Sequence, residues 1–432
     1  MIEHVGFRGD RSGIFPLTWG QRGLWLAILA ARGEEQYLSV ERVLMPPTRS
    51  GPVTVRRALD ALGVLMGRHE ALRTRLTGPD EEPRQLVAGE GSLPVSVVES
   101  DPELAQTTFG YFDEWPVRVA LVTEDDRVVR IVLVFSHLAV DGHGADIVLR
   151  DLRLILARGR APELTAAQPV DIAAQETSPE GRRIAARALD FWAAEHARLD
   201  PVTFAATPEP LRYREGVLHS SALEAAAGAI AARLKVSSST VLLAAATALA
   251  GTLSGQRVCG IRPIVGNRFA ADRRDVVATV SQEGLVVLDL GVPTFDDLVA
   301  DCWRTALRAY RHAQYPADDR NAVVDAAGGD ALSFGCFNDQ RLIQRDDPLT
   351  KPPDRAALAA STFAWTGGMN RNICPFRVHV GGDAGILEVS LYADTALVPA
   401  RDIEAYLRGF ETLLVDAAHG EVKLADLPGL VA

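Results

Sequence analysis

Residues 135–142 read Phe-Ser-His-Leu-Ala-Val-Asp-Gly, and the spacing of apolar residues changes across this stretch. Before it, Val128 to Phe135 form an almost unbroken apolar run rich in β-branched residues, which predicts a buried strand. After Gly144, apolar residues recur every three or four positions, which predicts a helix: Ala145, Val148, Leu149, Leu152 and Ile155. We therefore expect His137 at a strand-to-helix corner, where a rigid scaffold presents a side chain to a cavity.

Two interpretations of His137 are open from this stretch alone. Imidazole exchanges a proton near neutral pH, which suits a general base. A histidine at the end of a strand is about as often a core residue whose hydrogen bonds are satisfied. Other segments of the chain favour the first interpretation.

Five further segments resemble, in the right order, core motifs of the condensation domains of nonribosomal peptide synthetases. Each motif is weak by itself, but their order along the chain is strong evidence, and the resemblance runs from about residue 15 to about residue 416. The segments are residues 17–25 (LTWGQRGLW), 68–76 (RHEALRTRL), 260–268 (GIRPIVGNR), 309–316 (AYRHAQYP) and 334–338 (FGCFN).

The resemblance implies an α/β (α+β) fold of two chloramphenicol-acetyltransferase-like subdomains, arranged as a V-shaped pseudodimer. The N-terminal subdomain, residues 1–175, would carry the S-H-x-x-x-D-G motif, and residues 176–432 would form the C-terminal subdomain. The histidine would lie in a tunnel between the two. A site between subdomains suits a reaction from which water must be excluded.

The resemblance also implies roles for the residues of the motif. His137 is the expected catalytic residue, as general base or as a group that orients the nucleophile. Asp141 is expected to turn away from it and pair with Arg268, holding the corner in place. Gly142 is interpreted as a backbone requirement, with either a positive φ or a close approach that a Cβ would prevent.

Ser136 and Asn338 are the candidate residues of the substrate tunnel. The family usually has two histidines in tandem, and Ser136 replaces the first, which is not the one thought to reach the reaction centre. We therefore expect Ser136→His to be close to neutral. Asn338 matches a polar tunnel residue of the family, and a turn-forming asparagine is the alternative.

The function implied is that of a free-standing condensation enzyme in natural-product biosynthesis, such as nonribosomal peptide and antibiotic pathways. It would form an amide or ester bond between an acyl or aminoacyl thioester and an amine or hydroxyl acceptor. The donor would be presented on the phosphopantetheine of a peptidyl carrier protein acting in trans, and no cofactor would be bound to this chain. The acceptor would be a small molecule or a second carrier-bound group. Two alternatives are an acyltransferase that uses acyl-CoA and a non-catalytic recruitment module, since Ser136 alters the usual motif.

Composition excludes several other classes. The 432 residues are 47% hydrophobic and carry a net charge of −11, and arginine-rich pieces lie among acids, so nothing indicates nucleic-acid binding. An acidic chain would need a local basic patch to bind an acidic carrier protein. The longest apolar run, Val241 to Gly251, is too short to span a bilayer, and no cluster has metal-ligand spacing.

The spacing of the four cysteines predicts their redox state and the cellular compartment of the protein. Cys259, Cys302, Cys336 and Cys374 are widely spaced and include no C-x-x-C pair, so we expect reduced thiols in a cytoplasmic protein. Cys336 is interpreted as a small buried hydrophobic residue and not as a nucleophile. We expect a monomer.

Overall fold

The structure is a computed structural model of the chain. It describes residues 1–47, 51–100, 102–199, 211–329, 335–341, 353, 360–372, 374–382 and 385–431. Residue 334, the first of the FGCFN motif, lies outside the described residues.

Contacts between residues divide the chain into two units. Unit 1 comprises Met1–Arg183 and Gly266–Ser281, and unit 2 comprises Ile184–Val265 and Gln282–Ala432. The boundary expected from the sequence, after residue 175, falls within helix α4 (Pro169–Thr177) and stays a prediction. The segment Gly266–Ser281 leaves the sheet of unit 2 and belongs by its contacts to unit 1, so unit 1 is not continuous in sequence.

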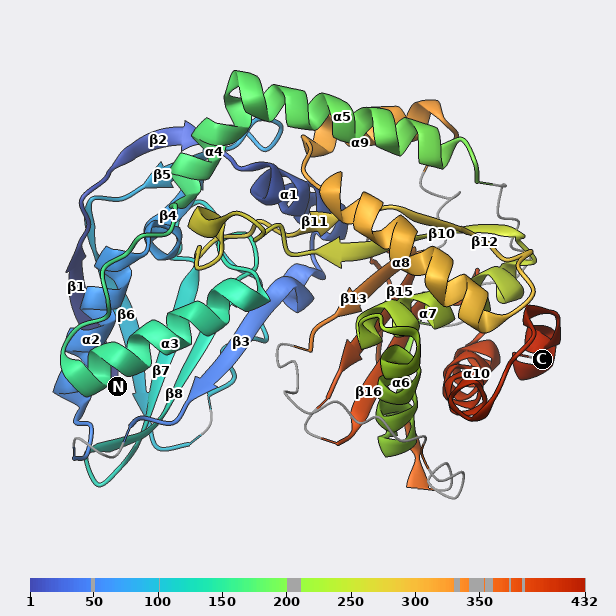
Figure 1. The fold of residues 1–432 in the computed structure, drawn as a ribbon. Coiled ribbons are helices and arrows are strands. Elements are labelled where there is room, and N and C mark those ends of the chain that lie inside the picture. Colours follow the sequence, from blue (N-terminus) through green and yellow to red (C-terminus); the bar gives the residue numbers. More distant parts are fainter. Residues whose placement is uncertain are drawn as a thin grey trace. The chain divides into compact units, whose positions relative to one another are not determined.

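The main sheet of unit 1 has five strands in the order β1-β6-β7-β8-β3 (Figure 1). β6 and β7 run parallel, and the other neighbours are antiparallel. The two helices α2 and α3 contact each other and the sheet. The bounds are β1 (Ile2–Arg8), β3 (Ser39–Leu44), β6 (Glu90–Val98), β7 (Val117–Glu124), β8 (Arg127–Ser136), α2 (Val55–Arg68) and α3 (Gly142–Arg158).

The expected strand and helix around His137 are both confirmed, as β8 and α3. Ile131, Leu133 and Phe135 of β8 are fully buried in the same core cluster as Val148 and Leu152 of α3. The alternating face of the strand and the three-to-four spacing of the helix therefore meet in one core, which fixes the corner between them.

Smaller elements complete unit 1. A second sheet has three strands in the order β2-β5-β4. The bounds are β2 (Gly13–Pro16), β4 (Thr74–Thr77), β5 (Arg84–Val87), α1 (Trp19–Ala31), α4 (Pro169–Thr177) and the 3-10 helices Glu35–Leu38, Glu70–Arg73 and Ala271–Arg273.

The sheet of unit 2 has eight strands in the order β11-β10-β13-β15-β16-β9-β14, with β12 also paired to β10. One core cluster contains residues of this sheet together with α6, α7, α8 and α10. The bounds are β9 (Tyr213–Ser220), β10 (Val258–Val265), β11 (Gln282–Glu283), β12 (Val286–Asp289), β13 (Gly335–Asp339), β14 (Thr362–Met369), β15 (Phe376–Gly381), β16 (Leu387–Asp394), α5 (Pro179–His196), α6 (Ser221–Leu234), α7 (Ser238–Ser254), α8 (Phe295–Arg311), α9 (Ala317–Ala326), α10 (Ala400–His419) and the 3-10 helix Leu424–Leu430.

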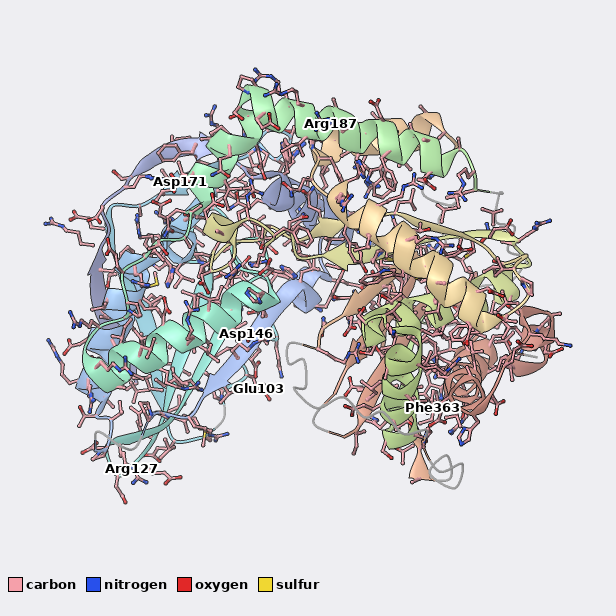
Figure 2. All side chains as sticks on the ribbon, viewed as in Figure 1. Glu103, Arg127, Asp146, Asp171, Arg187 and Phe363 are labelled. Atoms are coloured by element: carbon pink, nitrogen blue, oxygen red, sulfur yellow. A yellow bond between two sulfur atoms is a disulfide. The ribbon has the colours of Figure 1, made fainter. Side chains whose placement is uncertain are left out.

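The polar side chains at the surface are solvated, as the mixed charge pattern predicts. Arg127, the first residue of β8, and Arg187 on α5 are both exposed and project from the ribbon (Figure 2). Among the described helices, none is by itself long and apolar enough to cross a membrane. The pair α6 and α7 passes that test of length and composition together but is bent by 108°.

A buried carboxyl group gives unit 1 a pH-dependent stability. Glu176, near the end of α4, accepts a 2.7 Å hydrogen bond from the backbone N–H of Trp19, the first residue of α1. Burial raises the pKa of Glu176 from its ordinary 4.5 to about 7, against the opposing effects of the Trp19 hydrogen bond and of Arg273. Because the folded state holds this proton more tightly than the unfolded state, the contribution to stability is full below about pH 4.5 and is lost as pH rises through about 7.

We therefore expect Glu176→Gln to stabilise the protein above pH 7, where the wild-type carboxyl must ionise in the fold. The amide keeps an acceptor oxygen for Trp19. The gain over wild type in the free energy of unfolding should approach about 3 kcal/mol at pH 8 and fall toward zero at pH 4.5. Urea unfolding of both proteins across this pH range checks it. A difference that does not change with pH would contradict the assignment.

Candidate functional site

The site is built on the corner between β8 and α3. Asp141 is the N-cap of α3, and its Oδ1 accepts a 2.9 Å hydrogen bond from Gly144 N. Asp141 thus satisfies one of the N–H groups that a helix start leaves without a partner. The preceding turn is held by backbone hydrogen bonds from Ala139 N and Val140 N to Ser136 O.

His137 lies in this turn, and its backbone is held on both sides. Its N–H donates to Leu38 O at 3.1 Å, and its carbonyl oxygen accepts a hydrogen bond from the hydroxyl of Thr279. Thr279 belongs to the segment Gly266–Ser281, which returns to unit 1. The backbone of His137 is therefore held by two segments that are distant in sequence.

The imidazole of His137 is left available for chemistry. Its side chain is half-buried, and Nδ1 is buried with no hydrogen-bond partner among the described residues. Buried polar atoms are rarely left without a partner, so this one needs an explanation. Since no described protein group holds Nδ1, the half-buried ring keeps its hydrogen-bonding capacity for a substrate group.

Asp141 makes the ion pair that the resemblance implies. Arg268 Nη1 and Nη2 donate to its two carboxylate oxygens at 2.8 and 2.7 Å, and Val280 N lies 3.4 Å from Oδ2. Arg268 also donates to the backbone oxygens of Val276 and Ala278 at 3.3 Å. The carboxylate therefore faces donors of the returning segment and not the imidazole, so its part is to hold the corner.

The expectation for Gly142 is wrong. Gly142 is the first residue of α3 and has no positive φ. A Cβ placed there would have its nearest neighbour, Arg42 Nη2, at 3.6 Å, which is ordinary van der Waals contact. The chain enters the helix through Asp141 in a common extended conformation, so the corner needs no glycine at this position.

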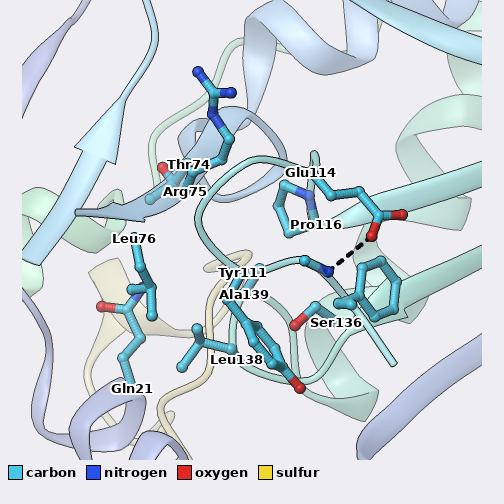
Figure 3. Close-up of a pocket in the computed structure, with 12 residues that line it drawn as sticks. Gln21, Thr74, Arg75, Leu76, Tyr111, Glu114, Pro116, Ser136, Leu138 and Ala139 are labelled. Atoms are coloured by element: carbon cyan, nitrogen blue, oxygen red, sulfur yellow. Dashed lines mark hydrogen bonds between the residues drawn. The ribbon is translucent and has the colours of Figure 1, made fainter. Parts of the chain in front are cut away.

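Ser136 lines a pocket within unit 1 (Figure 3). The pocket is small, with a cavity volume of about 20 Å³, enough for about one water molecule, and Ser136 is 2% exposed. Both neighbours of His137 in the chain, Ser136 and Leu138, are among the residues that line it: Gln21, Thr74, Arg75, Leu76, Phe109, Gly110, Tyr111, Glu114, Pro116, Ser136, Leu138 and Ala139.

Asn338 lies in unit 2, in the interior of strand β13. It is paired in register with His379 of β15 and is half-buried. Its place within a strand excludes the interpretation as a turn-forming asparagine. Burial, with a smaller contribution from Arg377, lowers the pKa of His379 to about 3, so a neutral imidazole lies beside Asn338 on the sheet.

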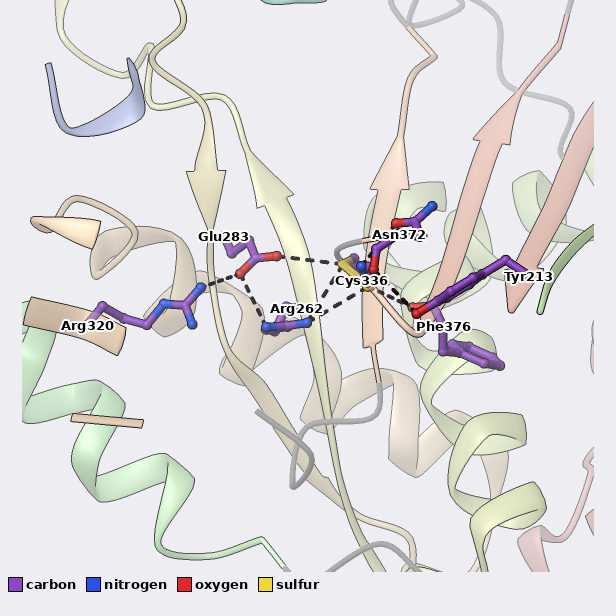
Figure 4. The surroundings of a disulfide bond; sticks show 8 residues. Tyr213, Arg262, Glu283, Arg320, Cys336, Asn372 and Phe376 are labelled. Atoms are coloured by element: carbon purple, nitrogen blue, oxygen red, sulfur yellow. Dashed lines mark hydrogen bonds and ion pairs between the residues drawn. A yellow bond between two sulfur atoms is a disulfide. The ribbon is translucent and has the colours of Figure 1, made fainter. Parts of the chain in front are cut away.

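The expectation of four reduced thiols is corrected by the structure. Cys336 and Cys374 form a disulfide with a Cα–Cα distance of 6.6 Å, next to the ion pair of Arg262 and Glu283 (Figure 4). Cys259 and Cys302 are free and buried, and burial raises the pKa of both thiols. Disulfides are uncommon in a reducing cytoplasm, so the cytoplasmic location stays a prediction.

Two contributors to the site could not be read from the sequence. Thr279 and the pocket wall from Phe109 to Glu114 lie in irregular segments that have no periodic pattern. The only local signal for Gln21 is the T-x-x-Q spacing of a capping box. It does cap α1 with Thr18, and it also lines the pocket.

Within the described ranges, no group of three or more histidine, cysteine, aspartate or glutamate residues is placed to hold a metal ion.

Solved structures place these two units in a known class of fold, the chloramphenicol-acetyltransferase-like pseudodimer. The condensation domain of the monacolin K polyketide synthase MokA matches with a TM-score of 0.75 at 15% identity, over 96% of this chain and 100% of that chain. SgcC5 of Streptomyces globisporus matches with a TM-score of 0.72 at 19% identity, over 94% of this chain and 98% of that chain. The X-domain from teicoplanin biosynthesis matches with a TM-score of 0.71 at 18% identity, over 97% of this chain and 98% of that chain.

The family is shown by the sequence itself. The condensation domain model matches residues 11–333, so the chain belongs to the condensation domain family, as its motifs indicate. Surfactin synthase subunit 2 of Bacillus subtilis is 24% identical over 391 residues, covering 86% of this chain and 10% of that protein. Phosphinothricin tripeptide synthetase PhsC of Streptomyces viridochromogenes is 27% identical over 354 residues, covering 74% and 31%. The chain thus spans a third or less of either relative.

Proposed function

We propose that this chain is a condensation enzyme that transfers an acyl or aminoacyl group to an amine or hydroxyl acceptor. The donor is a thioester on the phosphopantetheine arm of a peptidyl carrier protein supplied in trans, so the chain itself needs no bound cofactor. The observation that carries the proposal is the free Nδ1 of His137 on a corner clamped by Asp141, Arg268 and Thr279.

The reaction requires a proton to be moved while two substrates are held together. A lone pair of the acceptor attacks the thioester carbonyl carbon, and the imidazole of His137 accepts the proton that the acceptor loses. The tetrahedral intermediate then collapses, the carbon–sulfur bond breaks, and the pantetheine thiolate leaves and takes up a proton. A thioester is already activated, so no serine or cysteine nucleophile of the protein is required.

Relatives of the chain support both kinds of acceptor. SgcC5 was solved with an aromatic 1,2-ethanediol, a compound that carries hydroxyl groups. Phosphinothricin tripeptide synthetase is named for a peptide product, which contains amide bonds. We propose that the acceptor is a small molecule or a second carrier-bound group, and that the enzyme acts as a monomer.

The same acyl group presented on a holo carrier protein and on CoA tests the identity of the donor. A carrier is recognised through its protein surface as well as its arm, whereas CoA offers only the arm. We expect kcat/KM to favour the carrier by about tenfold or more, equal to about 1.4 kcal/mol. Equal or better use of CoA would instead identify an acyl-CoA-dependent acyltransferase.

A recruitment module is the second candidate, and the observation that favours it is Ser136 in place of the first motif histidine. The X-domain, which shares this fold, was solved in a complex with OxyB of teicoplanin biosynthesis. If the chain binds carrier protein but transfers no acyl group from either donor, this second function replaces the first.

A further inference from the structure

A second hollow of unit 1 is large enough for a small molecule. Its cavity volume is about 410 Å³, which lies within the range for small-molecule sites, about 300 to 1,000 Å³. Its walls come from α1, from the 3-10 helix Glu35–Leu38 and from the loop 109–113. We call it the aromatic hollow, because four of its nine lining residues carry aromatic rings: Trp25, Phe109, Tyr111 and Phe112.

The walls of the aromatic hollow are held in place by the protein itself. The indole N–H of Trp25, a fully buried residue, donates to Asp80 O at 2.8 Å. The indole ring packs edge-on against Tyr111 and Phe112, at centroid distances of 5.5 and 5.9 Å. In the loop, Tyr111 O accepts a hydrogen bond from Leu76 N at 2.8 Å. The hollow is therefore formed before a ligand enters, so little ordering of side chains opposes binding.

Three charged side chains line the aromatic hollow, and two of them are carboxylates. Glu35 is only 8% exposed and accepts a hydrogen bond from Gly33 N. Among the described residues, neither Glu35 nor Asp113 forms an ion pair. Arg32, the third, is exposed and pairs with Asp80 at 2.7 Å; the hydrogen bond to Asp80 and its charge, with a smaller contribution from Glu35, raise the pKa of Arg32. A buried carboxylate without a counter-ion is costly, and a bound cation lowers that cost.

The other arginines near the aromatic hollow are engaged elsewhere. Arg118 pairs with Glu114 at 2.6 Å. The guanidinium of Arg75 lies over the ring of Trp115 at 4.5 Å and donates only to the backbone oxygen of Asp113, at 3.4 Å. The hollow therefore keeps more negative than positive charge.

Two of the aromatic rings are left for a ligand. The ring of Phe109 is already covered by the guanidinium of Arg118, which lies 4.1 Å from its centroid. Tyr111 is half-buried and Phe112 is 40% exposed. Burial, with a smaller contribution from the charge of Glu35, raises the pKa of Tyr111, so the carboxylate acts close to this ring. Aromatic faces beside a carboxylate are the combination that attracts ammonium groups.

We propose that the aromatic hollow binds an organic cation, an ammonium group attached to a compact apolar body such as a single aromatic ring. Glu35 faces the ammonium group, and the rings of Tyr111 and Phe112 cover the apolar body. A neutral ligand leaves the carboxylates without a counter-ion, and an anionic ligand is repelled by them. Binding of the cation does not depend on the acyl transfer proposed above.

The aromatic hollow shares its supports with the turn that carries His137. Glu35 begins the 3-10 helix that ends at Leu38, and Leu38 O accepts the 3.1 Å hydrogen bond from His137 N. Trp25 and Leu138 belong to the same small core cluster. The cation is thus bound by segments that also hold the candidate catalytic residue.

Calorimetric titration of the wild-type protein with three probes of similar size tests the proposal. The probes are the 2-phenylethylammonium ion, 2-phenylethanol and phenylacetate, at neutral pH. We expect the ammonium ion to bind at least about tenfold more tightly than the alcohol, equal to about 1.4 kcal/mol, and phenylacetate to bind more weakly than either. Equal affinity for the ammonium ion and the alcohol, or no binding of any probe, would overturn the proposal.

Variants locate the binding site of the cation. Glu35→Gln removes the charge but keeps an acceptor oxygen for Gly33 N, so we expect the preference for the ammonium ion to fall to about twofold or less while the alcohol binds as before. Asp113→Asn, on the exposed loop, should also lower the preference and gives a second variant if the first does not fold. The matched control is Glu41→Gln, an exposed carboxylate of β3, which should keep the wild-type preference. An unchanged preference in folded Glu35→Gln, or equal losses in Glu35→Gln and Glu41→Gln, would overturn the assignment of the site.

Discussion

Replacing Arg268 with alanine is expected to lower the free energy of unfolding by about 3 to 5 kcal/mol, because Asp141 would keep a buried charge without its partner. The two side chains are 10% and 5% exposed and are joined by hydrogen bonds of 2.7 and 2.8 Å. Asp141→Ala should cost a similar amount, since it leaves Arg268 unpaired and removes the N-cap of α3. Urea unfolding of each variant measures the change.

The double variant shows whether the two side chains act as a pair. With both charges removed, the loss should be clearly smaller than the two single losses added together. Asp60→Ala is the matched control, because Asp60 pairs with Arg56 at 3.1 Å on the exposed face of α2 and should cost less than about 1 kcal/mol. Small and additive losses in the free energy of unfolding at Asp141 and Arg268 would show that the two side chains do not hold the corner as a pair.

His137→Ala is expected to lower kcat by at least about tenfold, and by up to about 10⁴-fold if the imidazole is a full general base. The thermal midpoint should stay close to that of wild type, because the turn is held through backbone atoms of His137 and not through its ring. His143→Ala is the matched control, since His143 is exposed on the first turn of α3. Initial rates and thermal melts of the three proteins test this. A large drop in the midpoint would identify His137 as a core residue.

The strand and helix that meet at the corner could be predicted because each has one dominant period. β8 is apolar almost without interruption, and α3 repeats its apolar residues at helical spacing, so only the turn between them lacked a pattern. The partner of Asp141 lies 127 residues away, and only the order of family motifs pointed to Arg268. The local spacing of apolar residues is thus enough to predict β8 and α3. The pairing of Asp141 with Arg268 could be predicted only from the resemblance to the condensation domain family.

Other features depend on contacts that leave no local signal. The disulfide joins cysteines 38 residues apart, which spacing alone does not pair. The return of Gly266–Ser281 to unit 1 breaks the assumption that each half is continuous in sequence. The role given to Gly142 failed because a glycine in a motif suggests a special backbone, whereas this one begins an ordinary helix.

Single-turnover acyl transfer tests the central claim most directly. A holo carrier protein loaded with one acyl thioester is mixed with an amine acceptor and an excess of enzyme, and the product is followed by its mass. Wild type and His143→Ala should form the same product at the same rate, and His137→Ala should form it about tenfold or more slowly. Equal rates for wild type and His137→Ala would show that the corner histidine does not carry the reaction.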